Sequence, residues 1–156
     1  MTAAPTHITI VPDEWHMQHV GKLANGRLFY CETQVAYEDG QSHDYYVAYT
    51  FDNDGTLASH EIVPVGVRGQ YKDEDANRVG EEILERLGER TTETIKVRPF
   101  QIEFDGRTFG FVTSAWDEDG EDLPIEEADE EDIRVEAMPG NTISWYAPWE
   151  EGEYDT

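Results

Sequence analysis

Alternation of apolar and polar residues, interrupted by turn residues, is the feature that most restricts how this chain can fold. In Arg27–Glu38, Phe29, Cys31, Val35 and Tyr37 share one side of an extended segment. Such a two-residue period is typical of a β-strand. The segments predicted as strands are His7–Val11, Arg27–Glu38, Tyr45–Phe51, Leu57–Val65, Ile95–Phe104, Thr108–Trp116, Ile133–Ala137 and Thr142–Ala147. Because Gly, Asp and Asn separate many neighbouring segments, the pattern predicts antiparallel hairpins.

One segment has a helical period instead. In Asp73–Leu87, Val79, Ile83 and Leu87 recur at the spacing of one helix face, and Gly88 can end the helix. The first three residues of this segment are acidic, which suits the positive end of the helix dipole. The order of the elements therefore predicts an α+β fold: a mainly antiparallel sheet of hairpins with one amphipathic helix (73–88) packed on one face.

The length of 156 residues predicts one domain that spans the whole chain. We expect residues 1–6 to form a flexible N-terminus, residues 117–132 an acidic loop and residues 148–156 an acidic tail. Pro12–Ala24 is ambiguous, because its apolar residues have helical spacing and a short helix is one interpretation.

The acidic residues are concentrated in the second half of the chain. The sequence has 35 Asp and Glu against 11 Lys and Arg, a net charge of −24, of which residues 79–156 carry −17 (23 acids, 6 bases). In residues 117–132, 11 of the 16 residues are acidic and none is basic. Because nucleic acids and anionic membranes repel such a chain, neither is expected as a partner. Salt adaptation could also explain the acidity.

Cysteine content and hydropathy point to a cytoplasmic protein. Cys31 is the only cysteine, so no intrachain disulfide can form, and its place on an apolar strand face indicates a buried side chain. The N-terminus lacks the pattern of a signal peptide. No apolar stretch approaches the ~20 residues of a membrane span. The oligomeric state is left open.

The segment Phe51-Asp52-Asn53-Asp54-Gly55-Thr56-Leu57 resembles the first motif of haloacid-dehalogenase-type phosphatases. The resemblance implies that Asp52 is a nucleophile, that Asp54 is a general acid and base, and that Mg²⁺ offsets the phosphate charge. Asp, Asn and Gly are equally the residues that a β-turn requires, and a turn is the interpretation we favour here.

The same residues also resemble an EF-hand loop. With Gly55 aligned to the glycine of that loop, Asp52, Asp54 and Glu61 fall at positions that supply oxygen ligands. The resemblance implies a Ca²⁺ site formed by these three residues. No cofactor other than Ca²⁺ or Mg²⁺ is expected.

Three classes of function follow. The first, which we favour, is a non-enzymatic acidic interaction module that binds a basic protein, as an inhibitor, an immunity-type protein or a DNA mimic does. Its expected contact residues are Asp117, Glu118, Asp119, Glu121, Asp122, Glu126, Glu127, Asp129, Glu130, Glu131 and Asp132. The second is a metal-dependent protein or phosphohydrolase that uses Asp52 and Asp54. The third is a small-ligand binding domain with a pocket between sheet and helix.

Overall fold

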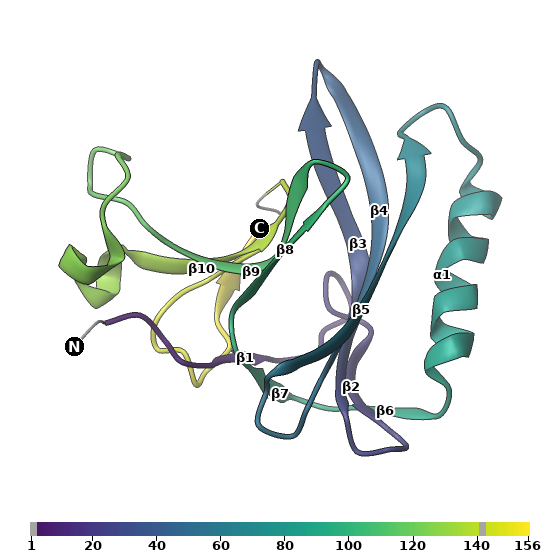
Figure 1. The fold of residues 1–156 in the computed structure, drawn as a ribbon, viewed down its shortest axis with the longest axis horizontal. Helices are drawn as coiled ribbons and strands as arrows, with labels where there is room; N and C mark the ends of the chain where they lie inside the picture. Colours follow the sequence, from purple (N-terminus) through teal and green to yellow (C-terminus); the bar gives the residue numbers. More distant parts are fainter. Residues whose placement is uncertain (1–2, 141–142) are drawn as a thin grey trace. The chain divides into compact units, whose positions relative to one another are not determined.

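The computed structural model describes residues 3–140 and 143–156. Within them the fold is α+β, with two antiparallel five-stranded sheets and one α-helix, which confirms the predicted class (Figure 1). The chain divides into two compact units: Ile10–Val97 forms one, and the other described residues form the second. A single domain over the whole chain stays a prediction. No helix in the described part of the chain is long and apolar enough to cross a membrane.

The sheet of the Ile10–Val97 unit consists of antiparallel strands in the order β5-β4-β3-β2-β6. These strands are β2 (Val20–Leu23), β3 (Leu28–Glu38), β4 (Gln41–Phe51), β5 (Leu57–Val67) and β6 (Arg90–Thr92). The β3–β4 hairpin turns at Asp39-Gly40, where both residues have positive φ (52° and 75°). Turns of this handedness match the twist of the paired strands, which explains why the Asp-Gly dipeptide predicted this hairpin.

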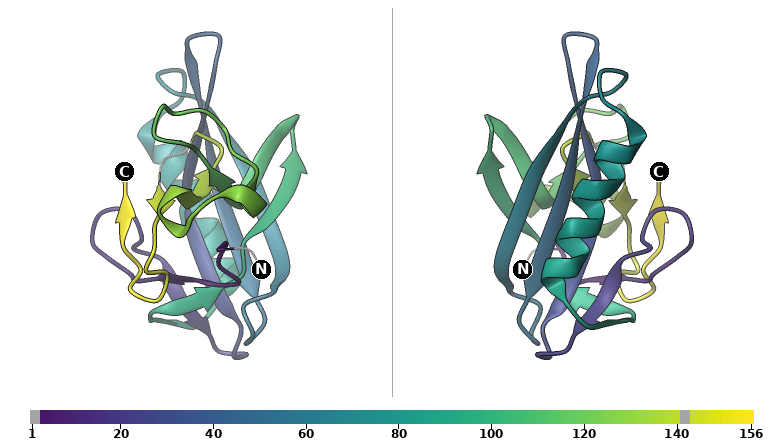
Figure 2. Two further views of the ribbon diagram at one scale, coloured as in Figure 1. Left: turned by 90° about the vertical axis from the view of Figure 1, so that its left-hand side faces the viewer. Right: turned by 90° about the vertical axis from the view of Figure 1, so that its right-hand side faces the viewer.

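The helix α1 (Asp73–Leu87) coincides with its prediction, and Figure 2 shows it lying across one face of this sheet. Ile83 is fully buried and packs with Phe29, Cys31 and Ala48 of the sheet. Gly88 has a φ of 80°, and its N–H donates to the carbonyls of Leu84 and Glu85, both at 3.2 Å. The helix ends there because a left-handed residue satisfies carbonyls that the last turn leaves without donors.

The second unit contains the sheet β12-β11-β10-β9-β8, also antiparallel. Its strands are β8 (Phe100–Phe104), β9 (Arg107–Ala115), β10 (Ile133–Met138), β11 (Ser144–Trp145) and β12 (Tyr154–Asp155). Asp105 and Gly106 both have positive φ (55° and 71°), as the predicted two-residue turn requires. The aromatic core of this unit includes Phe111, whose ring meets those of Phe100 and Trp145 edge to face at centroid distances of 5.2 Å.

Two segments differ from the sequence-based expectation for reasons of hydrogen bonding. Pro12–Ala24 contains no helix, and the chain there forms a loop followed by β2. In that loop one carboxylate oxygen of Asp13 accepts the N–H groups of Trp15, His16 and Met17, at 2.8, 2.7 and 3.1 Å. An aspartate that satisfies three successive N–H groups holds a tight turn in place of a continuing helix.

The other difference is a break in the strand predicted over residues 95–104. It consists of β7 (Ile95–Val97) and β8, with Arg98 and Pro99 between them. Proline lacks the N–H that a strand ladder needs, so the pairing stops there. The first predicted strand is present as β1 (Ile8–Ile10). Residues 141 and 142, in the last predicted hairpin, lie outside the described part of the chain.

The N-terminal segment that was expected to be flexible and the acidic tail both contact other parts of their unit. Ala3 and Ala4, in the segment expected to be flexible, pack against a buried cluster that contains Ala115 and Ile133. In the acidic tail, Tyr154 pairs with Trp145 and adds the edge strand β12. A pair of residues is too short to show an alternating pattern, which explains why the sequence did not predict this strand.

Candidate functional site

The acidic segment, defined here as residues 117–132, is the loop between β9 and β10 (Figure 1). It contains two short 3-10 turns, η1 (Ile125–Glu127) and η2 (Glu130–Asp132). Backbone hydrogen bonds attach it to the flanking strands at two places. Leu123, in its middle, donates to Ala115 at 2.8 Å, and Trp116 donates to Asp132, its last residue, at 3.1 Å. The backbone of this loop is therefore tied to the ends of the strands that flank it.

Apolar side chains of the acidic segment turn inward. Leu123, Ile125 and Ala128 pack in the cluster that contains Ala115 and Ile133. The eleven carboxylate residues predicted as contacts are mostly exposed. Nine of them are exposed, and Asp117 and Asp132 are half-buried. The packing of the apolar residues thus holds the carboxylates on the outer surface.

Basic residues are scarce in the sequence around the acidic segment. In residues 3–140 and 143–156, no ion pair joins any of the eleven to a basic side chain. Arg134 is the only lysine or arginine of residues 108–156. Its guanidinium lies over the ring of Trp116, 4.3 Å from the centroid, and 5.7 Å from that of Tyr146. The nearest base in the sequence is therefore engaged with aromatic rings.

Asp52 and Asp54 lie in the turn between β4 and β5. The N–H of Gly55 donates to the Asp52 carbonyl at 2.9 Å, and that of Thr56 donates to the Asp54 carboxylate at 3.0 Å. Gly55 has a φ of 87°, which only glycine adopts readily. These contacts support the turn interpretation of the motif.

The third residue of the predicted Ca²⁺ site, Glu61, lies on β5 and pairs with Arg86 of α1. Arg27 approaches Asp52, with 3.9 Å between Nε and Oδ1. Among the described residues, no group of three or more His, Cys, Asp and Glu side chains could hold a metal ion. The structure therefore does not bring Asp52, Asp54 and Glu61 together as a metal-binding group, and the roles implied for Asp52 and Asp54 in a phosphohydrolase stay predictions.

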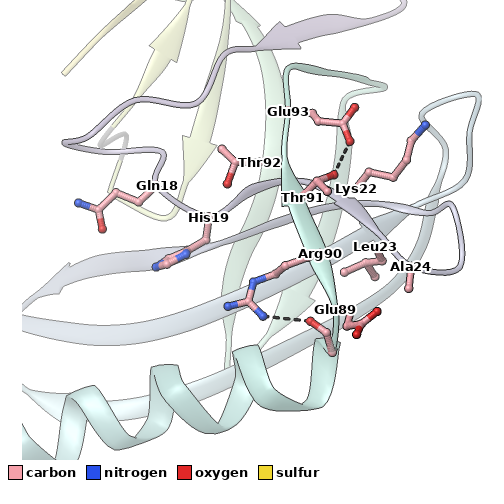
Figure 3. Close-up of a pocket in the computed structure, with 11 residues that line it drawn as sticks. Gln18, His19, Lys22, Leu23, Ala24, Glu89, Arg90, Thr91, Thr92 and Glu93 are labelled. Atoms are coloured by element: carbon pink, nitrogen blue, oxygen red, sulfur yellow. Dashed lines mark hydrogen bonds between the residues drawn. The ribbon is translucent and has the colours of Figure 1, made fainter.

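The Ile10–Val97 unit also contains two pockets. The sequence did not predict the larger one, whereas a pocket in the place of the smaller one is part of the third class of function. The larger, the β6 pocket, is an open hollow of about 960 Å³ at the β2–β6 edge, with His19, Lys22 and Arg90 in its lining (Figure 3). The smaller, of about 260 Å³, lies between the sheet and α1 and shares His19 with the first. Gly80 lines the smaller pocket, and a Cβ at this position would lie 2.8 Å from the Tyr46 ring. One signal in the sequence points to the edge where the larger pocket lies. Gly21 sits inside a strand-like run, and a glycine there often indicates that another backbone, here that of β6, lies close by.

Glu32 holds the loop that positions His19. Its carboxylate accepts the backbone N–H of His19 at 2.9 Å and that of Gln18. Burial raises the pKa of the Glu32 carboxyl to about 7, although these two N–H groups act in the opposite direction. The pKa of His19 is lowered by burial and by the charge of Arg90. The pKa of Cys31, in the smaller pocket, is raised to about 12 by burial, so the thiol is the inert buried group that the sequence indicated.

The raised pKa of Glu32 predicts a change of stability with pH. Between its ordinary value of 4.5 and about 7, the folded chain keeps a proton that the unfolded chain loses. The resulting penalty is absent below pH 4.5, grows as pH rises and is complete above pH 7. Glu32→Gln should therefore raise the melting temperature by a few degrees at about pH 8 and by much less at about pH 5.

The matched control for this measurement is Glu14→Gln, which removes one exposed carboxylate of the same unit. It corrects for the rise in melting temperature that the loss of any one negative charge gives an acidic chain, because repulsion among the carboxylates falls. An equal gain for both variants at both pH values would show that Glu32 has an ordinary pKa in the folded protein.

Comparison of the chain with protein-family models, with curated proteins and with solved structures finds no match.

Proposed function

We propose that this chain is a non-enzymatic acidic binding module whose acidic segment contacts a basic protein. The observation that carries the proposal is the set of carboxylates in residues 117–132, which sit on an ordered loop and have no ion-pair partner among the described residues. A surface of one sign attracts an oppositely charged partner over a distance and orients it before contact. Because the backbone is already tied down, binding would cost less conformational entropy than the ordering of a free acidic tail.

The negative charge of the acidic segment indicates which class of protein would bind it. Exposed carboxylates at close spacing present to a basic surface much the same field as the phosphates of a nucleic acid. An inhibitor of a basic enzyme, an immunity-type protein and a DNA mimic all fit this description. A cytoplasmic location, the expectation from the sequence, would suit each of them.

Affinity capture with two charge-matched variants tests the proposal. In the segment variant, all six glutamates of the acidic segment are changed to glutamine: Glu118, Glu121, Glu126, Glu127, Glu130 and Glu131. In the control variant, six exposed glutamates of the other unit are changed in the same way: Glu14, Glu74, Glu81, Glu82, Glu85 and Glu89. Both variants lose the same charge, so they differ only in where it is lost.

We expect wild type and the control variant to retain a basic protein from a lysate at low salt and to release it at high salt. The segment variant should retain at least about tenfold less, since removing several contacts of a charged interface costs well over 1.4 kcal/mol. Retention of no basic protein by the wild type, or equal retention by the two variants, would contradict the proposal.

A further inference from the structure

In the β6 pocket, side chains with hydrogen-bond donors lie together on one side of β6. Figure 3 shows the side chains of His19, Arg90 and Thr92 on one side of β6, while Lys22 and Glu93 lie on the other. Glu93 accepts a hydrogen bond from the Thr91 hydroxyl on that other side. The side with His19 and Arg90 therefore presents donors without the carboxylates that line the opposite side of the strand.

Arg90 is held by the end of the helix. Its Nη1 donates to the carbonyl oxygens of Leu84, at 3.2 Å, and Gly88, at 3.0 Å. The Gly88 carbonyl lies just beyond the last residue of α1, and the Leu84 carbonyl also accepts the Gly88 N–H. A guanidinium has five N–H donors in a planar fork, so a ligand can still be bound through the other nitrogens. Because the side chain is already anchored, ordering it on binding costs little.

The lack of an ion pair sets Arg90 apart from most arginines of its unit. Arg27, Arg68, Arg78 and Arg86 each pair with a carboxylate. In the described part of the chain Arg90 has no such partner, although the protein carries 35 acidic residues. An exposed guanidinium fork beside an imidazole and a hydroxyl is suited to a planar or tetrahedral oxyanion, which it can bind through two parallel hydrogen bonds.

We propose that Arg90, His19 and Thr92 bind the carboxylate or phosphate group of a small molecule in the β6 pocket. Arg90 supplies the charge and the paired donors, the Thr92 hydroxyl supplies a further donor, and the His19 imidazole becomes protonated against the bound anion. The size of the pocket, about 960 Å³, leaves room for the remainder of such a ligand. The proposed site shares no residue with the acidic segment and does not depend on a basic protein partner.

NMR titration of the full chain tests this assignment. Inorganic phosphate is added in one series and acetate in another, with sodium chloride used to hold the ionic strength constant. We expect saturable shifts of the Arg90 Nε–H and His19 ring signals in the millimolar range and a measurable rise in the pKa of His19. Stronger binding in the phosphate series would identify a phosphate-bearing ligand, and stronger binding in the acetate series a carboxylate.

Arg90→Gln should weaken the binding at least about tenfold, because the charged fork is lost. Lys72→Gln is the matched control: it removes another base without an ion pair in the described residues, at the opposite end of α1, and should leave the titration unchanged. The pKa of His19 in the wild-type protein, with and without phosphate, is a readout that does not depend on how the variants fold. No saturable shift in either series, an unchanged His19 pKa, or an Arg90→Gln variant that titrates like wild type would each overturn the proposal.

Discussion

Replacing Asp44 with alanine is expected to lower the free energy of unfolding by about 3 kcal/mol. The Asp44 side chain on β4 is only 8% exposed and accepts two hydrogen bonds from Arg68, at 2.7 and 3.2 Å. The hydroxyl of Tyr71 donates to the same carboxylate. Together these bonds join β4 to the connection between β5 and α1.

The size of this effect follows from what the substitution leaves behind. Without Asp44, the Arg68 guanidinium and the Tyr71 hydroxyl lose their shared acceptor. Arg68 is 58% exposed and can regain water, which limits the loss. The pKa of Tyr71 is raised to about 12. Burial is the largest cause, and the hydrogen bond to Asp44 is the second. Loss of the carboxylate should therefore also lower the pKa of that phenol.

Urea unfolding of Asp44→Ala and Asp44→Asn measures the contribution. Asparagine keeps one acceptor oxygen and the shape of the side chain, so it should cost about half as much as alanine. A loss below about 0.5 kcal/mol for Asp44→Ala would show that the network contributes little to stability.

Gly21→Val is expected to remove at least about 3 kcal/mol and to separate β6 from β2. A Cβ at Gly21 would lie 1.8 Å from the carbonyl oxygen of Thr91 and 2.8 Å from the backbone nitrogen of Glu93. Both atoms belong to the backbone of β6 or its continuation, so no side-chain rotation can relieve the contact. The edge strand must move, and its pairing between Gly21 and Thr92 is lost.

Hydrogen exchange at the amide of Glu93, which donates to the Val20 carbonyl of β2 at 3.2 Å, measures this effect together with urea unfolding. Lys22→Val is the control, since it places the same β-branched side chain at an exposed position of the same strand. It should change stability by no more than about 0.5 kcal/mol. Equal behaviour of the two variants would mean that β6 does not need a glycine opposite it.

The elements with strong local signals could be predicted from the sequence. The helix α1 and the Asp105-Gly106 turn are set by residues close together in the chain: a repeating apolar stripe in one case, and a dipeptide that tolerates positive φ in the other. The elements that the sequence did not predict depend on distant partners. β6 has three exposed residues and no alternating pattern, and it is a strand because Gly21 lets it approach β2.

The same distinction applies to the sites. The acidic segment was visible in the sequence, because a run of charge is a local property. Its orientation was not, since the inward packing of Leu123 and Ile125 depends on Ala115 and Ile133, which belong to the flanking strands. The β6 pocket was not predicted because His19 and Arg90 lie far apart in the sequence and meet only after the sheet forms.

The salt dependence of association tests the central proposal most directly. It is measured as the association rate constant with the basic protein captured by wild type. For wild type and the control variant, we predict a steep fall in this rate as salt is raised, since screening removes the attraction of the acidic segment. The segment variant, with its six glutamates changed to glutamine, should associate more slowly at low salt and depend much less on salt. An identical rate and slope for the segment variant and wild type would contradict the assignment of this surface.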